Sequence, residues 1–557
     1  MVRLFNCFFL IISIVLLLRV LLKNHNINEK EKNSDYFQID NLAYKILLIT
    51  IIIIGVLVRL WQFGVIPSGF NQDGAMAAVD GLALAKYGTN RFGTWLPAHL
   101  YAWGYSQMSS LLPYLIALFI KIFNFSPIVV RLPQLLVSIM GGIFFYLFMK
   151  DIFGKKIGLL AAFFVAINPW HFMQSRWTLE ANLLPHFFMG GLYFLNKGIT
   201  QKKKYIYISM IFFGLSMYCY GIAIYTIPFF LILTAVFYYV KKQINIKEIL
   251  ISICIYLLIS WPFILTMMVN FFKWDTIKLP FVTIQYFSDS VRSNDILFFS
   301  KNIGKQFCIN LGSLINTTIL QRKDLPWNDI TGFGTMYYFT IPFVIIGIIS
   351  LSKVELKENK YLIFLALLTG IWTGLTTNYV NVNRMNIIYY TIMMFAVIGI
   401  YQVMTKIKYA KLLIPMMYII IFIFMINTYF TTYSKEIGKY FYEGFGDALN
   451  KAESAGTSKI YITADAQGVG YVATSEILTM FYNKMDAKYF QGETNINNGK
   501  EYLLYKDRYH YLSITPDVIN ATKDDDVAYV IMNSDKQYFS DDYKIIDYGN
   551  FCAVTKK

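Results

Sequence analysis

Long apolar stretches separated by short polar segments run through most of this chain. Stretches of about 18 or more apolar residues are long enough to cross a bilayer as helices. The pattern predicts a polytopic α-helical membrane protein with about twelve spans. These spans are an N-terminal anchor at 4–22 and the runs 43–61, 127–149, 157–174, 181–196, 205–220, 222–240, 249–269, 336–351, 361–377, 387–404 and 412–430.

Composition supports this class, because 56% of the residues are hydrophobic and only 15% are charged. The net charge of +16 comes largely from lysines in alternate loops between the predicted spans, so it calls for no nucleic-acid partner. The lysine-rich loops are 23–45, with Lys23, Lys30, Lys32 and Lys45, and 150–156, 202–204, 241–247, 353–360 and 406–411. Positively charged loops stay in the cytoplasm, so segments 64–126, 270–335 and 431–557 are predicted to lie outside.

The polar and apolar pattern divides the chain into three parts. Residues 1–42 are an N-terminal anchor helix and a cytoplasmic linker, and residues 43–433 are the transmembrane domain with external loops 64–126 and 270–335. Residues 434–557 are more polar, with strand-like runs at 460–463, 528–532 and 543–547 and a helix over 472–483. They predict a small extracytoplasmic α/β domain. Residues 111–123 are apolar but short for a span, so we expect them to lie along the interface or to pack on the bundle.

The stretch 66–105 organises the rest of the chain, because it places the carboxylate of Asp73 directly ahead of a helix-like segment, 74–87, at the outer face. Carboxylates at a membrane boundary are costly unless they are solvated, paired or used. Asp73 is therefore a candidate general base. An aspartate at this position is also typical of a helix N-cap, and the residue types leave both roles open.

Two further polar segments, 168–182 and 378–386, fall at the outer ends of predicted spans and bring Arg176, Glu180, His171 and Arg384 to the same level. Arg176 and Glu180 have the i,i+4 spacing of a helical salt bridge, which is an alternative to ligand binding. Arg384 has the alternative role of an interfacial anchor. His171 has no second His or Cys at ligand spacing, so no metal site is predicted, although assistance by a divalent ion stays open.

Three pieces of the chain carry a resemblance to a known group. GFNQDGAMAAVDGLALAKYGTNRFGTWLP, NPWHFMQSRWTLEANLLP and NVNRMNIIYY resemble the GT-C superfamily of membrane glycosyltransferases, of the protein-mannosyltransferase/ArnT-like type (glycosyltransferase family 39). The likeness is strongest over residues 43–195. It implies a GT-C-like fold and transfer of a sugar from a polyprenyl-phosphate carrier to an acceptor outside the cytoplasm. No other cofactor is implied.

The resemblance also implies roles for particular residues. In that family the first external loop carries a general base that is often followed by a glutamate, whereas Asp73 is followed by Gly74. Glu180 or Asp80 then supplies the second carboxylate, or none is needed. One prominent base favours direct displacement with inversion at the sugar. Arg384 is the first candidate to bind the carrier phosphate and Arg176 is the second. The further candidates for substrate contact are Asn71, Gln72, His171 and Asn182.

These expectations define the partners as the lipid bilayer, the lipid-linked donor and an extracytoplasmic acceptor, which is a protein, a glycolipid or a wall polymer. The location is the plasma membrane. Two rivals remain. A secondary transporter would show related halves and charges near the midplane, and neither is visible in the sequence. A catalytically silent GT-C-like scaffold of envelope assembly is kept open by Gly74 in place of the glutamate.

Overall fold

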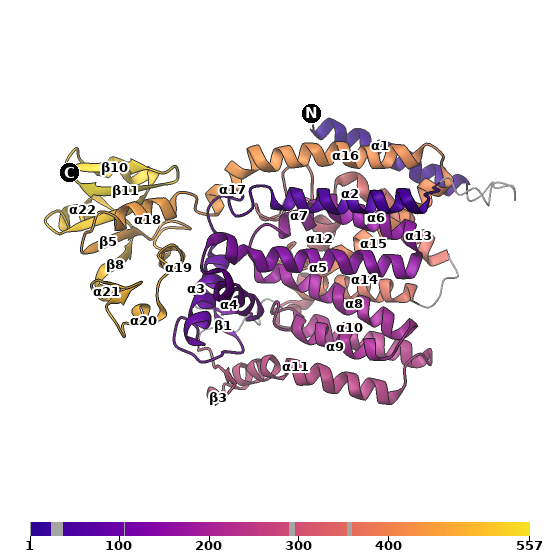
Figure 1. Cartoon of the computed structure of the whole chain (residues 1–557), viewed down its shortest axis with the longest axis horizontal. Coiled ribbons are helices and arrows are strands. Elements are labelled where there is room, and N and C mark those ends of the chain that lie inside the picture. Colours follow the sequence, from indigo (N-terminus) through magenta and orange to yellow (C-terminus); the bar gives the residue numbers. More distant parts are fainter. Residues whose placement is uncertain (1, 24–36, 105, 289–295, 323, 354–358) are drawn as a thin grey trace.

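A computed structural model describes residues 2–23, 37–104, 106–288, 296–322, 324–353 and 359–557. Lys30, Lys32 and Lys357 of the predicted cytoplasmic loops, and Tyr105 in the predicted external stretch, lie outside the described residues. Long helices run alongside one another as a bundle, and the C-terminal region is attached at one end of it (Figure 1). We call this end the loop-bearing end, because α3, α4 and β1 lie there as well.

The bundle confirms a multi-pass α-helical membrane protein. Its helices are α1 (Val2–Lys23), α2 (Asn41–Leu60), α5 (Pro127–Phe153), α6 (Lys155–Ile167), α8 (Leu184–Thr200), α9 (Lys204–Ser216), α10 (Ala223–Val240), α11 (Ile246–Phe272), α13 (Ile341–Lys353), α14 (Lys360–Thr376), α15 (Ile388–Lys406) and α16 (Ala410–Thr428). Within the described residues, 7 helices are long and apolar enough to cross a membrane. The number of twelve spans stays a prediction.

Local signals in the sequence explain where the long helices begin and how closely they pack. The Ser126 side chain accepts a hydrogen bond from the backbone N–H of Val129, with proline in the first turn of α5. An Asn245–Glu248 capping box begins α11. Gly347 of α13 faces the backbone of α15, where an added Cβ would lie 1.9 Å from the carbonyl oxygen of Phe395. Small residues permit such close approach between membrane helices.

The first loop region folds into short elements at the loop-bearing end. These are α3 (Gln72–Tyr87), β1 (Leu100–Tyr101), β2 (Gln107–Met108) and α4 (Leu111–Phe123). Residues 111–123 were expected either to lie along the interface or to pack on the bundle. In the structure α4 packs on the bundle, where it contacts α3 and α5. The predicted span 157–174 is interrupted at Asn168, which separates α6 from α7 (Pro169–Gln174), and η2 (Glu180–Leu183) precedes α8. The predicted external segment 270–335 contains hairpin β3–β4 (Ile277–Leu279, Val282–Ile284), η4 (Leu297–Phe299) and helix α12 (Ile303–Thr318).

The C-terminal region is a small α/β unit. Its five-stranded sheet has the order β10-β11-β9-β5-β8, in which β5 runs parallel to both β8 and β9. The strands are β5 (Lys459–Thr463), β8 (Tyr509–Leu512), β9 (Val527–Met532), β10 (Tyr543–Asp547) and β11 (Phe551–Lys556), and the helices are α17 (Ser434–Tyr440), α18 (Phe445–Glu453), α19 (Val472–Tyr482), α20 (Ala487–Phe490), α21 (Tyr505–Arg508) and α22 (Pro516–Ala521), with hairpin β6–β7 (Ile496–Asn497, Lys500–Glu501). The predicted α/β character is confirmed, and β8, β11 and α18 add to the predicted elements.

Contacts of three kinds join the α/β unit to α3 and the chain around it. Phe70 stacks on Phe481 with ring centroids 4.3 Å apart. Lys86 forms an ion pair with Asp486, whose carboxylate also accepts a hydrogen bond from the Tyr87 hydroxyl. Desolvation raises the pKa of Asp486, but these two donors and a backbone N–H outweigh it and hold the pKa below its usual value. The α/β unit therefore rests on the helix that carries Asp73.

A buried ion pair fixes the middle of α3 to the chain that follows it. The Arg91 guanidinium lies 2.6 Å from the Asp80 carboxylate, and both side chains are almost fully buried. The backbone N–H of Arg91 also donates to Asp80, and Arg91 donates to the carbonyls of Tyr101 and Ala102. Asp80 therefore has a structural set of partners and is not free to act as a second catalytic carboxylate.

Replacement of Arg91 with Ala leaves the Asp80 carboxylate buried without its cation. We expect a loss of about 3–5 kcal/mol of stability, read as a lower Tm of the purified protein in detergent. Lys86→Ala is the matched control, because Lys86 is 52% exposed in its ion pair. Its cost should stay within about 1 kcal/mol. Equal shifts for the two variants would contradict the structural role assigned to Arg91.

Candidate functional site

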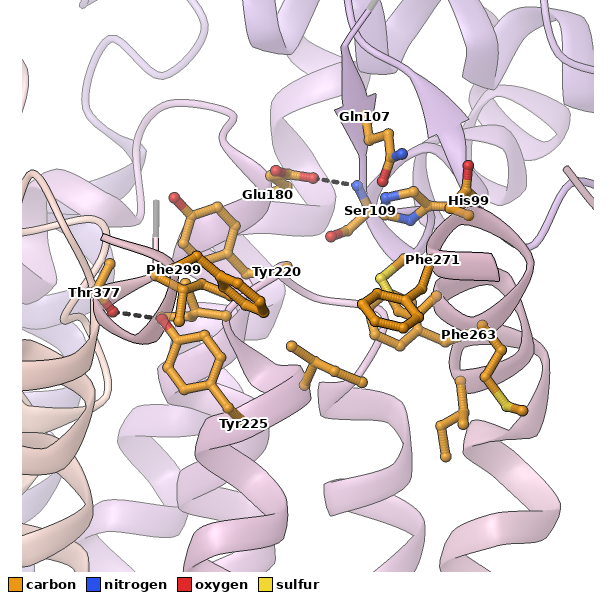
Figure 2. Close-up of a pocket in the computed structure, with 18 of the residues that line it drawn as sticks. His99, Gln107, Ser109, Glu180, Tyr220, Tyr225, Phe263, Phe271, Phe299 and Thr377 are labelled. Atoms are coloured by element: carbon orange, nitrogen blue, oxygen red, sulfur yellow. Dashed lines mark hydrogen bonds between the residues drawn. The ribbon is translucent and has the colours of Figure 1, made fainter. Parts of the chain in front are cut away.

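A cavity at the loop-bearing end has a volume of about 650 Å³. This volume is typical of small-molecule sites, which span roughly 300–1,000 Å³. Figure 2 shows that its lining comes from the β1–β2 region, from Glu180 and from helices far apart in the sequence. The polar and charged side chains of the lining are His99, Gln107, Ser109, Glu180, Asn270, Lys273, Thr377 and Arg384, with the tyrosines Tyr220 and Tyr225.

One wall of this cavity is polar and held by backbone contacts. The Glu180 carboxylate accepts a hydrogen bond of 2.6 Å from the backbone N–H of Ser109 (Figure 2). Glu180 is only 8% exposed, so this carboxylate is largely desolvated. His99 lies beside it, with Phe263 and Phe287 packed edge-on against the imidazole. A hydrogen bond to a carboxylate favours its charged form.

The opposite wall is apolar and belongs to two membrane helices. Its large side chains are Ile224 of α10 and Ile264, Met267, Met268 and Phe271 of α11. At the edge of this wall, the Tyr225 hydroxyl shares a hydrogen bond with Thr377 (Figure 2). A cavity with one polar and one apolar wall suits an amphipathic ligand that has a charged head and a hydrocarbon tail.

Arg384 supplies the positive charge of the lining. Its Nη1 donates to the backbone carbonyl of Asn378 over 2.7 Å, and its own backbone N–H donates to Asn381 Oδ1. The guanidinium carbon lies 5.8 Å from the centroid of the Tyr379 ring. The side chain is half-buried. The guanidinium is thus fixed by its own loop while it borders the cavity, and guanidinium groups bind phosphate with parallel hydrogen bonds.

Asp73 lies in the first turn of α3, while the N-cap position belongs to Asn71, so Asp73 does not cap this helix. Asp73 Oδ1 accepts a hydrogen bond of 2.7 Å from the Trp103 indole. Burial, and to a lesser extent the Asp73 charge, raise the pKa of Tyr442. The backbone N–H of Phe70, just before α3, donates to the carbonyl of Phe441, so the start of α3 lies next to the start of the α/β unit. Asp73 is not among the described residues that line the cavity. The 100–109 segment connects the two acids, because Trp103 contacts Asp73 and Ser109 contacts Glu180.

The glycine that follows Asp73 is explained by packing. A Cβ at Gly74 would lie 2.9 Å from Asn71 Oδ1 and from Phe70 Cε1, and 3.1 Å from the Thr178 carbonyl oxygen. Backbone and ring atoms on three sides leave no room for a glutamate side chain at this position without a shift of its neighbours. A second carboxylate near the site must therefore come from another segment, and Glu180 is the one that reaches the cavity.

Arg176 is fully buried and makes a different set of contacts from the one expected. Its guanidinium donates to five backbone carbonyls, those of Val58, Arg59, Trp61, Gln62 and Ile66, and its Nε donates to the Tyr429 hydroxyl. The Arg176 nitrogens are thus occupied by protein groups. The i,i+4 pairing with Glu180 does not form as a helical salt bridge, because α7 ends at Gln174 and Glu180 begins η2.

The remaining predicted contacts lie around the cavity rather than in its lining. His171 is buried, with Nδ1 3.0 Å from Arg59 Nη2 and Nε2 3.1 Å from the Tyr390 hydroxyl. It borders a second, smaller cavity of about 180 Å³. Asn182 accepts a hydrogen bond from Asn386, and Asn71 donates to the Thr178 carbonyl. Gln72 is the half-buried first residue of α3. Among the described residues no three His, Cys, Asp or Glu side chains group as metal ligands.

Sequence reasoning missed His99, Gln107, Ser109 and Thr377. His99 and Gln107 are polar residues within otherwise apolar or aromatic surroundings in the 66–105 stretch and just after it, which was the available signal. Ser109 acts through its backbone N–H, and side-chain chemistry gives no sign of that role. Thr377 reaches the cavity because α14 ends beside α10, a proximity that the order of the sequence does not reveal.

This fold is that of a multi-pass α-helical membrane protein with a small C-terminal α/β unit. Residues 109–284 match the family model described as dolichyl-phosphate-mannose-protein mannosyltransferase. This region contains Ser109 and Glu180 but ends before Arg384 and begins after Asp73. No curated protein sequence matches the chain.

Two solved structures were found to be similar, and the ArnT structure shares the overall fold. The chain is similar to ArnT from Cupriavidus metallidurans bound to undecaprenyl phosphate, with 9% identity, a TM-score of 0.57, and coverage of 91% of this chain and 97% of ArnT. The oligosaccharyltransferase AglB from Archaeoglobus fulgidus is 14% identical, with a TM-score of 0.45 and coverage of 78% of this chain and 63% of AglB. The family match and the shared ArnT fold confirm the predicted resemblance to GT-C glycosyltransferases of the protein-mannosyltransferase/ArnT-like type.

Replacement of Arg176 with Gln leaves most of its five carbonyl acceptors without a donor. Each unsatisfied buried group costs about 1–3 kcal/mol, so we expect a large fall in Tm and in the yield of folded protein. Arg384→Gln is the matched control, because Arg384 is only half-buried, and the Tm of this variant should change little. A stable Arg176→Gln protein would contradict the structural role of Arg176.

Proposed function

We propose that this protein is a glycosyltransferase that moves a sugar from a polyprenyl-phosphate carrier to an acceptor hydroxyl at the outer face of the plasma membrane. The observation that carries the proposal is the cavity at the loop-bearing end, which joins the Arg384 guanidinium and the Glu180 carboxylate to an apolar wall of α10 and α11. A lipid-linked sugar phosphate has the matching parts: a hydrocarbon tail, an anionic head and a polar sugar.

In this proposal the apolar wall binds the tail and Arg384 binds the phosphate. Negative charge grows on the phosphate oxygen as its bond to the sugar breaks, and a preorganised guanidinium stabilises that charge. The similarity to ArnT, whose structure contains undecaprenyl phosphate, supports this assignment by analogy of fold. The Lys273 side chain at the end of α11 adds positive charge to the same lining.

Asp73 is the proposed general base. The acceptor oxygen attacks the anomeric carbon, its proton passes to the Asp73 carboxylate, and the bond from that carbon to the phosphate oxygen breaks, which releases polyprenyl phosphate. Direct displacement inverts the anomeric centre. Asp73 adjoins the α/β unit through Trp103 and Tyr442, so an acceptor reaching it would approach from that unit. Glu180, whose charged form is favoured by the Ser109 N–H, orients the sugar in the cavity.

The lysine distribution supports an extracytoplasmic position for the site and for the α/β unit. The lysine-rich loops 150–156, 202–204, 241–247 and 406–411 join helices at the end of the bundle remote from the C-terminal region (Figure 1). By the positive-inside rule the loop-bearing end then faces outward. The α/β unit would recognise the acceptor there, since it packs on α3 and contacts Trp103 through Tyr471.

Replacement of Asp73 with Asn should remove the base while keeping the hydrogen-bond acceptor for Trp103. We expect kcat for transfer from a polyprenyl-phosphate sugar to fall by roughly 10²–10⁴-fold with KM for the donor little changed. Glu180→Gln should raise KM for the donor more than it lowers kcat, and Asp517→Asn in α22 is the distant control. If Asp73→Asn kept full transfer activity and Glu180→Gln lost it, the general base would be Glu180, and the assignment of Asp73 would be wrong.

Replacement of Arg384 with Gln should weaken donor binding. Hydrogen bonds to charged groups contribute about 1.5–3 kcal/mol, so we expect roughly a 10- to 100-fold rise in the Kd of polyprenyl phosphate, measured by fluorescence competition in nanodiscs. Arg322→Gln is the control, because Arg322 is an exposed arginine outside the lining. Unchanged binding by Arg384→Gln would place the phosphate elsewhere.

A further inference from the structure

Helix α12 has its apolar and polar faces reversed relative to a helix in water. Its outward face is apolar, with Ile303, Phe307, Ile309, Leu311 and Ile315 all exposed. Ile319 and Leu320 extend this exposed surface just beyond the helix. A helix on the surface of a soluble protein turns its apolar stripe inward and its polar face outward.

The inward face of α12 is correspondingly polar. Asn310 is fully buried, and its Nδ2 donates to the carbonyl of Leu375 over 2.9 Å and to Asn378 Oδ1 over 3.2 Å. Gln306 donates to Asn310 Oδ1, and Thr317 and Thr318 are also buried. These contacts attach α12 to the end of α14, a helix of the bundle. The polar groups are thus used against protein. Leu314 is buried on the same inward face, whereas the other large apolar side chains of α12 are exposed.

The lipid bilayer is the partner that this reversed helix fits. Interfacial helices bury an apolar face among acyl chains while basic residues contact anionic headgroups. Lys301 and Lys305 are exposed at the start of α12, and Phe298 and Phe299 are exposed immediately before it. The surface is also continuous with the bundle, because α12 packs on the outer end of α14, whose Leu368 is exposed. Exposure of this many apolar side chains of α12 and its flanking residues to water would be energetically unfavourable.

We propose that α12 is an interfacial helix, docked in the bilayer through its apolar face and bound to anionic headgroups through Lys301 and Lys305. For this region, segment 270–335, the sequence predicts only an external loop. Ile296 and Phe299, next to α12, line the 650 Å³ cavity. Asn378, held by Asn310, accepts the hydrogen bond from Arg384. If the proposed function holds, bilayer contact thereby helps to position the phosphate ligand.

The native Cys308 allows a direct test, because it is exposed on α12. Cys7→Ser and Cys254→Ser remove the other two exposed cysteines on transmembrane helices, and Cys219 and Cys552 are buried. The full-length protein is labelled at Cys308 with an environment-sensitive fluorophore and reconstituted in phosphatidylcholine vesicles that contain phosphatidylglycerol. Quenching by doxyl-labelled lipids is compared with quenching by iodide. The control probe is Val469→Cys with Cys308→Ser, since Val469 is 94% exposed on the α/β unit.

We expect doxyl lipids to quench the Cys308 probe several-fold more strongly than the Val469→Cys probe, and iodide to show the opposite order. Lys301→Gln/Lys305→Gln should lessen lipid quenching at Cys308 in vesicles with phosphatidylglycerol more than in pure phosphatidylcholine. Strong iodide quenching without lipid quenching would place α12 in water and overturn the proposal. Protection from both quenchers would assign the surface to protein, including a second copy, and would also overturn it. The measurement needs no substrate, so failure to detect sugar transfer leaves its result unaffected.

Discussion

The arrangement of the loop-bearing end depends on the guanidinium of Arg176. A helix leaves its last carbonyls without partners, and these groups are costly where water is excluded. Arg176 donates to Val58 and Arg59 at the end of α2 and to three carbonyls of the following turn up to Ile66. It therefore fixes the path by which the chain leaves α2 and enters α3, and so it fixes the position of Asp73.

Two more buried arginines act in the same way. Arg59 donates to the carbonyls of Val165 and Ala166 at the end of α6, and Arg131 donates to those of Pro67 and Gly69. Arg131 also lies over the ring of Phe70, which stacks on Phe481 of the α/β unit. Hydrogen bonds from arginines to backbone oxygens thus join helix ends to the loop before α3. The ring of Phe70 connects this loop to the α/β unit. Arg384, in contrast, borders the cavity and lines it.

Local patterns predicted much of the fold because spans and strands depend on neighbouring residues. The run 543–547 became β10 with the same bounds, and the predicted span 222–240 became α10 (Ala223–Val240). The roles of arginines were harder to predict, since Arg176 and Arg384 look alike until their neighbours in space are known. The helical spacing of Arg176 and Glu180 failed because α7 ends at Gln174, before both residues, and Glu180 begins η2. The sequence predicts segment 270–335 only as an external loop. The structure shows that this segment contains α12 and that most of the large apolar side chains of α12 are exposed.

In the proposed binding mode, one cavity holds both the charged head and the hydrocarbon tail of a lipid-linked sugar. A structure of the protein determined in a nanodisc with polyprenyl phosphate measures this directly. The account predicts phosphate density against the Arg384 guanidinium, with the first part of the tail along α10 and α11 and Glu180 facing the space where the sugar would lie. Phosphate bound away from this cavity, or a tail that leaves along other helices, would contradict it.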